Sequence, residues 1–266
     1  MLSKLLLVSG GGNTVKRVEG LIGNCDIYLD KVERFGENRK QLLLRTAQKV
    51  EIKATQKPQA LYFKTQPDNS ADRPFVPVLK TKPFGLTPLS ADILRAQQDP
   101  IGFFSSLSSP ADFEFGHPYT SEIQSLTPLS LSSVISLVSG LPREPSFTYV
   151  DSEETLSDVS TALQGTRVFA FDLEHHSDHS FLGFTCLMQI SVPGHDFVID
   201  ALLLREKLHL LAPAFADPSI LKVAHGATSD ISWLQRDFGI YVVNLLDTAV
   251  LGKRVHTGSI SFGSLV

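Results

Sequence analysis

The stretch Arg-Val-Phe-Ala-Phe-Asp-Leu-Glu, residues 167–174, decides the fold class of this chain. The apolar run from Val168 to Phe171 predicts a buried strand, and residues two apart on a strand project from the same face. Asp172 and Glu174 therefore lie side by side at the end of that strand. Unless the strand end is solvated, two like charges there need a proton, a basic partner or a metal ion.

A third carboxylate follows 58 residues later, in His-Gly-Ala-Thr-Ser-Asp-Ile at 225–231. Asp230 lies near the start of a predicted helix. It either caps that helix, which would stabilise it by about 1 kcal/mol, or joins Asp172 and Glu174 in one site. Three hard oxygen donors suit Mg²⁺ or Mn²⁺. The chemistry that such a cage supports is two-metal phosphodiester cleavage, with ions about 3.5–4 Å apart.

The pattern around these motifs predicts an α/β domain from residue 146 onward. Strands are expected at 147–150, 167–174, 185–192, 196–200, 221–224 and 242–246, and helices at 153–163, 204–216 and 229–238. The short connections between 167 and 200 favour a meander. Asp200 and Asp247 end apolar strands, and we interpret them as structural residues rather than as further metal ligands.

The rest of the chain divides by composition. Residues 1–55 have helical spacing, and residues 56–145 are rich in proline and serine, which predicts an extended wrapping segment or a linker. The compact domain covers 146–251, and 252–266 forms a tail of low information. Two cysteines make no disulfide framework, which fits a reducing compartment. No apolar run approaches the roughly 18 residues that span a membrane.

Charge is distributed unevenly within the net value of −4. Residues 31–82 carry 12 Lys and Arg against 5 Asp and Glu, whereas residues 146–247 carry 5 against 14. A basic segment beside an acidic catalytic module suits nucleic acid. The alternative is that 31–49 is a solvated helix face and 50–82 an exposed linker.

Four runs of sequence carry a family resemblance: Phe-Ala-Phe-Asp-Leu-Glu-His-His-Ser at 169–177, and the stretches at 181–191, 225–239 and 241–248. They resemble the exonuclease domain of exosome-associated 3′–5′ exoribonucleases, within the DEDD-type, RNase D-like family. The resemblance implies a ribonuclease H-like mixed sheet in which Asp172, Glu174 and Asp230 are catalytic and hold two Mg²⁺ or Mn²⁺ ions. In the family, residues 1–55 would correspond to the last part of a helical cofactor-binding region.

The same resemblance implies that His175, His225 and Trp233 bind the nucleotide. From the residues alone, His225 is equally well explained as a hydrogen-bonding residue of the core. Trp233 lies one helical turn after Asp230 and is equally well explained as a buried contact between helix and sheet.

The implied activity is hydrolysis from the 3′ ends of single-stranded RNA, releasing nucleoside 5′-monophosphates. The implied partners are the nuclear exosome core and small nuclear cofactor proteins, with the nucleus and nucleolus as location and no membrane. The family's third acidic motif, Tyr-x-x-x-Asp, occurs nowhere in this chain. We therefore expect a truncated exonuclease domain, incomplete at the C-terminal end of its sheet and nearly inactive by itself. The alternatives are a non-catalytic RNA-binding or scaffold remnant, and a DNA exonuclease or proofreading domain.

Overall fold

Six strands form one mixed sheet in the computed structural model, which describes residues 58–64, 75–110, 113–127, 146–177 and 180–255, and isolated positions between 130 and 136. The strand order is β1-β4-β3-β2-β5-β6. The pairs β2–β3 and β3–β4 are antiparallel, and the other pairs are parallel. The strands are β1 Ser146–Val150, β2 Val168–His176, β3 Phe184–Val192, β4 His195–Asp200, β5 Leu221–Ala224 and β6 Leu245–Asp247. The predicted α/β class, the mixed sheet and the meander are confirmed.

Helices flank this sheet and continue into the segment before it. They are α2 Pro58–Tyr62, α3 Ala91–Gln98, α4 Pro100–Ser105, α5 Thr120–Ser125, α7 Glu153–Gln164, α8 Ala212–Ala216, α9 Thr228–Trp233 and α10 Thr248–Val255, with the 3₁₀ turn η3 Leu208–Leu211 and the π-helical turn η4 Leu234–Phe238. Helix α7 is capped by Ser152, whose side chain forms a reciprocal capping box with that of Thr155. Gly239 ends η4 in the left-handed conformation, at φ 64°.

Two predicted elements differ from the structure. The helix expected at 204–216 starts only at Leu208, because the Asp200 carboxylate accepts hydrogen bonds from the backbone of Leu202 and Leu203 and closes a turn there. The strand expected at 242–246 begins at Leu245, because Asn244 takes a left-handed conformation with φ 62° that a regular strand does not accommodate.

The main core lies on the sheet face that carries Phe169 and Phe171. Both rings pack edge-on against Phe215 of α8, with centroids 5.0 and 5.3 Å apart. Helix α7 buries Leu156, Val159 and Leu163 in the same cluster. Residues alternate across a strand, so the opposite face carries Asp172 and Glu174.

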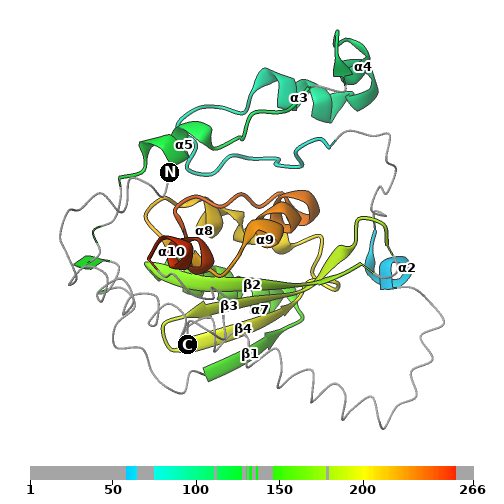
Figure 1. Cartoon of the computed structure of the whole chain (residues 1–266). Coiled ribbons are helices and arrows are strands. Elements are labelled where there is room, and N and C mark those ends of the chain that lie inside the picture. The colour runs from blue at the N-terminus through cyan, green and yellow to red at the C-terminus, as the bar shows by residue number, and fades with distance from the viewer. Residues whose placement is uncertain are drawn as a thin grey trace.

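We call residues 146–255 the module and residues 75–127 the arm. The arm lies across the side of the molecule formed by α8, α9 and α10, away from β1 (Figure 1). The two parts share a small buried cluster of Leu79 and Tyr119 from the arm with Ala216, Tyr241 and Val243 from the module.

The arm is less extended than the sequence predicted. Ser90 caps α3 through a hydrogen bond from Ile93 N, and Asp99 caps α4, whose first residue is Pro100. These are favourable signals for a helix start. Two short helices therefore interrupt the proline-rich segment, and Phe103 and Phe104 of α4 pack with Phe113 and Phe115.

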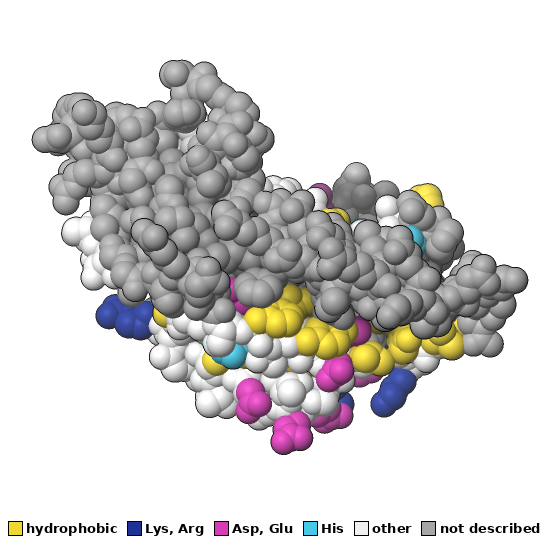
Figure 2. Space-filling model, turned by 90° about the horizontal axis from the view of Figure 1, so that it is seen from below, with side chains coloured by type: hydrophobic (Ala, Val, Ile, Leu, Met, Phe, Trp, Pro, Cys, Tyr) yellow, Lys and Arg dark blue, Asp and Glu magenta, His cyan; other side chains and the backbone are white. Residues whose placement is uncertain are grey.

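The predicted helical region at 1–55 and the last residues of the tail, 256–266, lie outside the described residues. Within the described part of the chain, no helix is both long enough and apolar enough to cross a bilayer. Seen from below, the described surface groups acidic side chains beside a band of hydrophobic ones (Figure 2), in keeping with the acidic balance of the module.

Candidate active site

The Asp172–Glu174 strand end and the start of α9 are joined by one buried hydrogen bond. Asp230 Oδ1 accepts from the backbone N–H of Leu173 at 3.1 Å, and Leu173 stands between Asp172 and Glu174 in β2. Asp230 is 8% exposed, whereas Asp172 and Glu174 are half-buried. The cap of α9 is Ala227, so Asp230 is not the capping residue. Its carboxylate faces the strand that carries the other two.

Burial raises the pKa of Asp230, and the negative charges of Asp247 and Glu174 raise it further against the backbone hydrogen bonds that lower it. An ionised carboxylate here is therefore held against both desolvation and repulsion. A cation at this edge would relieve both.

Asp247 fixes the loop that leads into α9. Its Oδ1 accepts from Gly226 N at 2.9 Å, and its Oδ2 accepts from Ala227 N at 3.0 Å. Oδ1 also accepts from Ala249 N and Val250 N in the first turn of α10. The structural role predicted for Asp247 fits these bonds. The structural role predicted for Asp200 fits as well, since Asp200 Oδ2 accepts from the Tyr149 hydroxyl at 2.6 Å.

His175 and Trp233 form a parallel stack beside this edge. Their ring centroids are 4.1 Å apart and the ring planes differ by 4°. Burial and the neighbouring Arg236 guanidinium lower the pKa of His175, so its ring is neutral near pH 7. Trp233 also contacts the main core and is partly buried. Both proposed uses of Trp233, as a core residue and as a surface for a base, are compatible with this position.

His225 is tied to the same framework. Its Nδ1 lies 2.8 Å from the hydroxyl of Thr248, the first residue of α10. This contact matches the hydrogen-bonding interpretation of His225. Its role toward a nucleotide stays a prediction.

Sequence reasoning missed the ion-pair network behind His175. Asp237 accepts from Arg236 Nε at 2.8 Å, from Arg205 Nη2 at 3.2 Å and from Thr185 N at 2.9 Å. Burial acts to raise the pKa of Asp237, but Arg236 and Arg205 outweigh it, and the pKa lies below its usual range. Arg236 Nη2 in turn lies 3.3 Å from His175 Nε2. The only signal for this network in the sequence was the adjacent pair Arg236 and Asp237, which lies within the stretch 225–239 that carries the family resemblance.

The chemistry of the donor set fits a hard divalent cation, because it consists of carboxylate oxygens at one strand end. Among the described residues, however, no three His, Cys, Asp or Glu side chains surround a common point closely enough to hold an ion. Asp172 and Glu174 would supply the first ligands, with Asp230 beside them.

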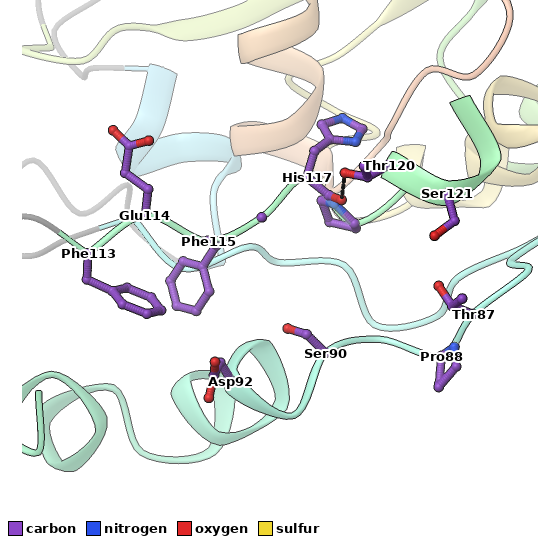
Figure 3. Close-up of a pocket in the computed structure, with 12 residues that line it drawn as sticks. Thr87, Pro88, Ser90, Asp92, Phe113, Glu114, Phe115, His117, Thr120 and Ser121 are labelled. Atoms are coloured by element: carbon purple, nitrogen blue, oxygen red, sulfur yellow. Dashed lines mark hydrogen bonds between the residues drawn. The ribbon is translucent and has the colours of Figure 1, made fainter. Parts of the chain in front are cut away.

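A cavity of about 300 Å³ lies in the arm, apart from these carboxylates. One wall comes from Thr87, Ser90 and Asp92, and the other from the chain between Phe113 and Ser121 (Figure 3). Phe113 and Phe115 point to one side of their segment, and Glu114 points to the other. Its lining contains none of the predicted site residues, so the cavity belongs to the arm and not to the edge that carries Asp172 and Glu174.

Comparison with known proteins assigns the class. Residues 147–266 match the sequence family described as 3′–5′ exonuclease. The match covers the strand end with Asp172 and Glu174, and the helix with Asp230. Residues 147–266 therefore carry a 3′–5′ exonuclease domain of the DEDD-type, RNase D-like kind, a metal-dependent family.

Within that class, similar proteins include an exosome exonuclease and exosome components. The chain is 43% identical over 204 residues to the exosome complex exonuclease RRP6 of Saccharomyces cerevisiae, which covers 76% of this chain and 27% of the yeast protein. It is 37% identical over 225 residues to exosome complex component 10 of Homo sapiens, covering 77% and 25%. The crystal structure of the catalytic core of RRP6 from Trypanosoma brucei superimposes with a TM-score of 0.51 at 35% identity, covering 77% of this chain and 50% of that one. This chain thus spans about a quarter of the length of the curated relatives.

Proposed function

We propose that this chain carries part of the catalytic module of a nuclear 3′–5′ exoribonuclease that works with the RNA exosome. The observation that carries the proposal is the hydrogen bond from Leu173 N to Asp230, which holds the third carboxylate beside the Asp172–Glu174 strand end. Relatives named as exosome exonucleases and exosome components support the substrate and the partner. The substrate class is the 3′ end of single-stranded RNA, and the products are nucleoside 5′-monophosphates. The location is the nucleus, including the nucleolus, and small nuclear cofactor proteins are further partners.

The proposed cofactors are two Mg²⁺ or Mn²⁺ ions held by Asp172 and Glu174, with Asp230 assisting. When bound, such ions activate water and stabilise the leaving oxygen of the phosphodiester. The protein's own contributions are to hold Asp230 at the strand, to keep His175 neutral, and to present the His175–Trp233 stack to the terminal nucleotide. His225, bonded to Thr248, orients the loop that precedes Asp230.

We further propose that residues 1–266 by themselves bind RNA and metal better than they turn RNA over. Asp172, Glu174 and Asp230 are three carboxylates, whereas the family site uses a fourth from Tyr-x-x-x-Asp, together with the tyrosine that positions water. Catalysis depends steeply on correct coordination and orientation. We expect the missing pair to lower the rate by orders of magnitude.

The test compares the full chain with Asp172→Asn and Asp230→Asn, using Asp158→Asn as a matched control because Asp158 is exposed on α7. Titration calorimetry with Mn²⁺ should show weaker binding for both site variants, most for Asp172→Asn, and no change for the control. Equal affinity for the wild type and Asp172→Asn would remove Asp172 as a ligand.

A 5′-labelled single-stranded RNA and the matching DNA then test the substrate and the reaction. Preferred binding of RNA with little shortening supports the proposal as stated. If the chain shortens RNA robustly and Asp172→Ala abolishes this activity, the proposed exoribonuclease function stands. The proposed low rate of residues 1–266 is then wrong. Preferred cleavage of DNA would favour a DNA exonuclease. Metal-independent RNA binding that the site variants do not affect would favour a scaffold remnant.

A further inference from the structure

The side chain of Phe181 is unusually exposed for its size. It is 81% accessible, more than any other large hydrophobic side chain among the described residues, and it stands beside Leu182 at 42%. Single exposed apolar residues are ordinary on a protein surface. What distinguishes Phe181 is its position beside the proposed nucleotide site.

The residues that follow Phe181 are held firmly. Arg236 Nη1 donates to the carbonyl of Leu182 at 2.6 Å, and Nη2 donates to the carbonyl of Gly183 at 3.4 Å. Arg236 is itself paired with Asp237 at 2.8 Å. Gly183 N donates to Ser180 O at 3.1 Å and closes a turn around Phe181. The aromatic ring is therefore displayed on a fixed turn.

This turn also touches the stack. Gly183 has φ +64°, and a Cβ atom placed there would lie 2.0 Å from His175 Cε1. Only glycine allows the backbone to approach the ring this closely. Phe181 lies two residues before Gly183, so the backbones of these two residues are at most about 7 Å apart. The exposed ring therefore lies on the same turn that contacts the His175–Trp233 stack.

We propose that Phe181 is a second stacking surface, which takes the base of the nucleotide that precedes the 3′-terminal one in a single-stranded RNA. This rests on the proposed function. Stacking on an aromatic ring does not depend on the identity of the base, so the contact would add affinity for a strand without restricting its sequence. The His175–Trp233 stack would hold the terminal nucleotide, and Phe181 the next one.

The test measures affinity against oligonucleotide length. Adenosine monophosphate and RNA oligonucleotides of two, four and eight nucleotides are titrated with Mn²⁺ into the full chain, with gel analysis to verify that the RNA stays intact. Phe181→Ala is compared with Phe84→Ala, which removes an equally large ring that is 52% exposed on the arm. Phe181→Trp is the conservative variant.

We expect Phe181→Ala to weaken binding of oligonucleotides of two or more residues by roughly 5- to 100-fold. Binding of the mononucleotide should not change. Phe181→Trp should keep the affinity for longer RNA, and Phe84→Ala should match the wild type.

Two outcomes would overturn the proposal alone: unchanged affinity of Phe181→Ala at every length, which would leave this ring as a contact for protein, or an equal loss for the mononucleotide. If the wild type gains no affinity as the RNA lengthens, the role of Phe181 fails while the proposed function stands; if the wild type binds no RNA at any length, the proposed function fails as well.

Discussion

The module and the arm bury their side chains in different ways. The module has one continuous core, in which the strand residues Phe169 and Phe171 meet Phe215 of α8 and the apolar face of α7. The arm has a separate group of phenylalanines, which joins α4 to the segment at 113–115, and it reaches the module through contacts near Tyr119 and Tyr241. Stability in the module is therefore shared by many residues, whereas attachment of the arm depends on few.

The two parts also treat charge differently. The arm buries the pair Lys82–Glu122, at 2.7 Å, with side chains 5% and 3% exposed. Glu122 also accepts from the backbone N–H of Leu86, at 2.5 Å, and so anchors the turn that contains Phe84. The module places three carboxylates near one strand end, where burial and repulsion raise the pKa of Asp230. Charge in the arm is paired and buried, whereas the negative charges near Asp230 at the module's edge repel one another.

The strongest test of this contrast compares one core phenylalanine from each part. Phe171→Ala should lower the free energy of unfolding by about 3–5 kcal/mol, visible as a shift of the urea midpoint followed by Trp233 fluorescence. Phe103→Ala removes a ring that is 3% exposed in the arm. It should increase hydrogen exchange within residues 91–115 and leave the Trp233 midpoint nearly unchanged. Equal midpoint shifts would mean that arm and module unfold as one unit.

The buried ion pair gives the next test. Glu122→Gln leaves the Lys82 ammonium buried without its partner, which typically costs about 3–5 kcal/mol. We expect faster hydrogen exchange and proteolysis at residues 82–87 and 119–125. Joint replacement by Lys82→Met and Glu122→Leu should cost far less, since apolar pairs often replace buried ion pairs without loss. A double variant as labile as Glu122→Gln would show that the Glu122 carboxylate is needed, as the partner of Lys82 or as the acceptor of the Leu86 N–H.

Removing the charge of Asp230 should stabilise the fold, whereas removing the charge of Glu122 should destabilise it. Because the folded state raises the pKa of Asp230, the ionised carboxylate destabilises the fold at neutral pH, and that cost disappears as the pH falls toward the ordinary aspartate value of 3.8. Asp230→Asn should therefore raise Tm at pH 7 in the presence of a chelator, by less than the first two effects. The gain should shrink at pH 4, and Asp158→Asn should show none. A constant gain at both pH values would remove the titration of Asp230 as its cause.

The smallest effect comes from a matched pair of helix caps. Ser152 caps α7 in the module, and Ser90 caps α3 in the arm, each with a backbone N–H bond at 3.2 Å. Either change to alanine should cost about 1 kcal/mol. Ser152→Ala should lower the Trp233 midpoint, whereas Ser90→Ala should act only on hydrogen exchange in α3. The contrast fails if Ser90→Ala moves the midpoint as well.

The strands could be predicted from sequence because their apolar runs are long and their boundaries are marked by charge. Expected and observed limits of the strand that carries Asp172 differ by two residues or fewer. Strand alternation predicted that Asp172 and Glu174 lie on one face, and the motif at 225–231 predicted that Asp230 joins them. Position along the chain was sufficient for these residues.

The details that failed depend on single side chains acting on a distant backbone. Asp200 delays the helix after β4 by closing a turn, and the left-handed Asn244 shortens β6. The Asp237 network joins residues 32 and 52 positions apart, and no local periodicity announces such contacts. The arm helices could have been found from Ser90 and from Asp99 before Pro100, but the many prolines around them indicated extended chain.

The four backbone bonds of Asp247 have a mechanical consequence. Its single carboxylate accepts from Gly226 N and Ala227 N in the loop before α9. It also accepts from Ala249 N and Val250 N in α10. The loop before α9 and the first turn of α10 are therefore fixed to each other through this carboxylate. The loop begins only three residues before Asp230, so the same carboxylate that fixes the start of α10 also helps to fix the position of Asp230.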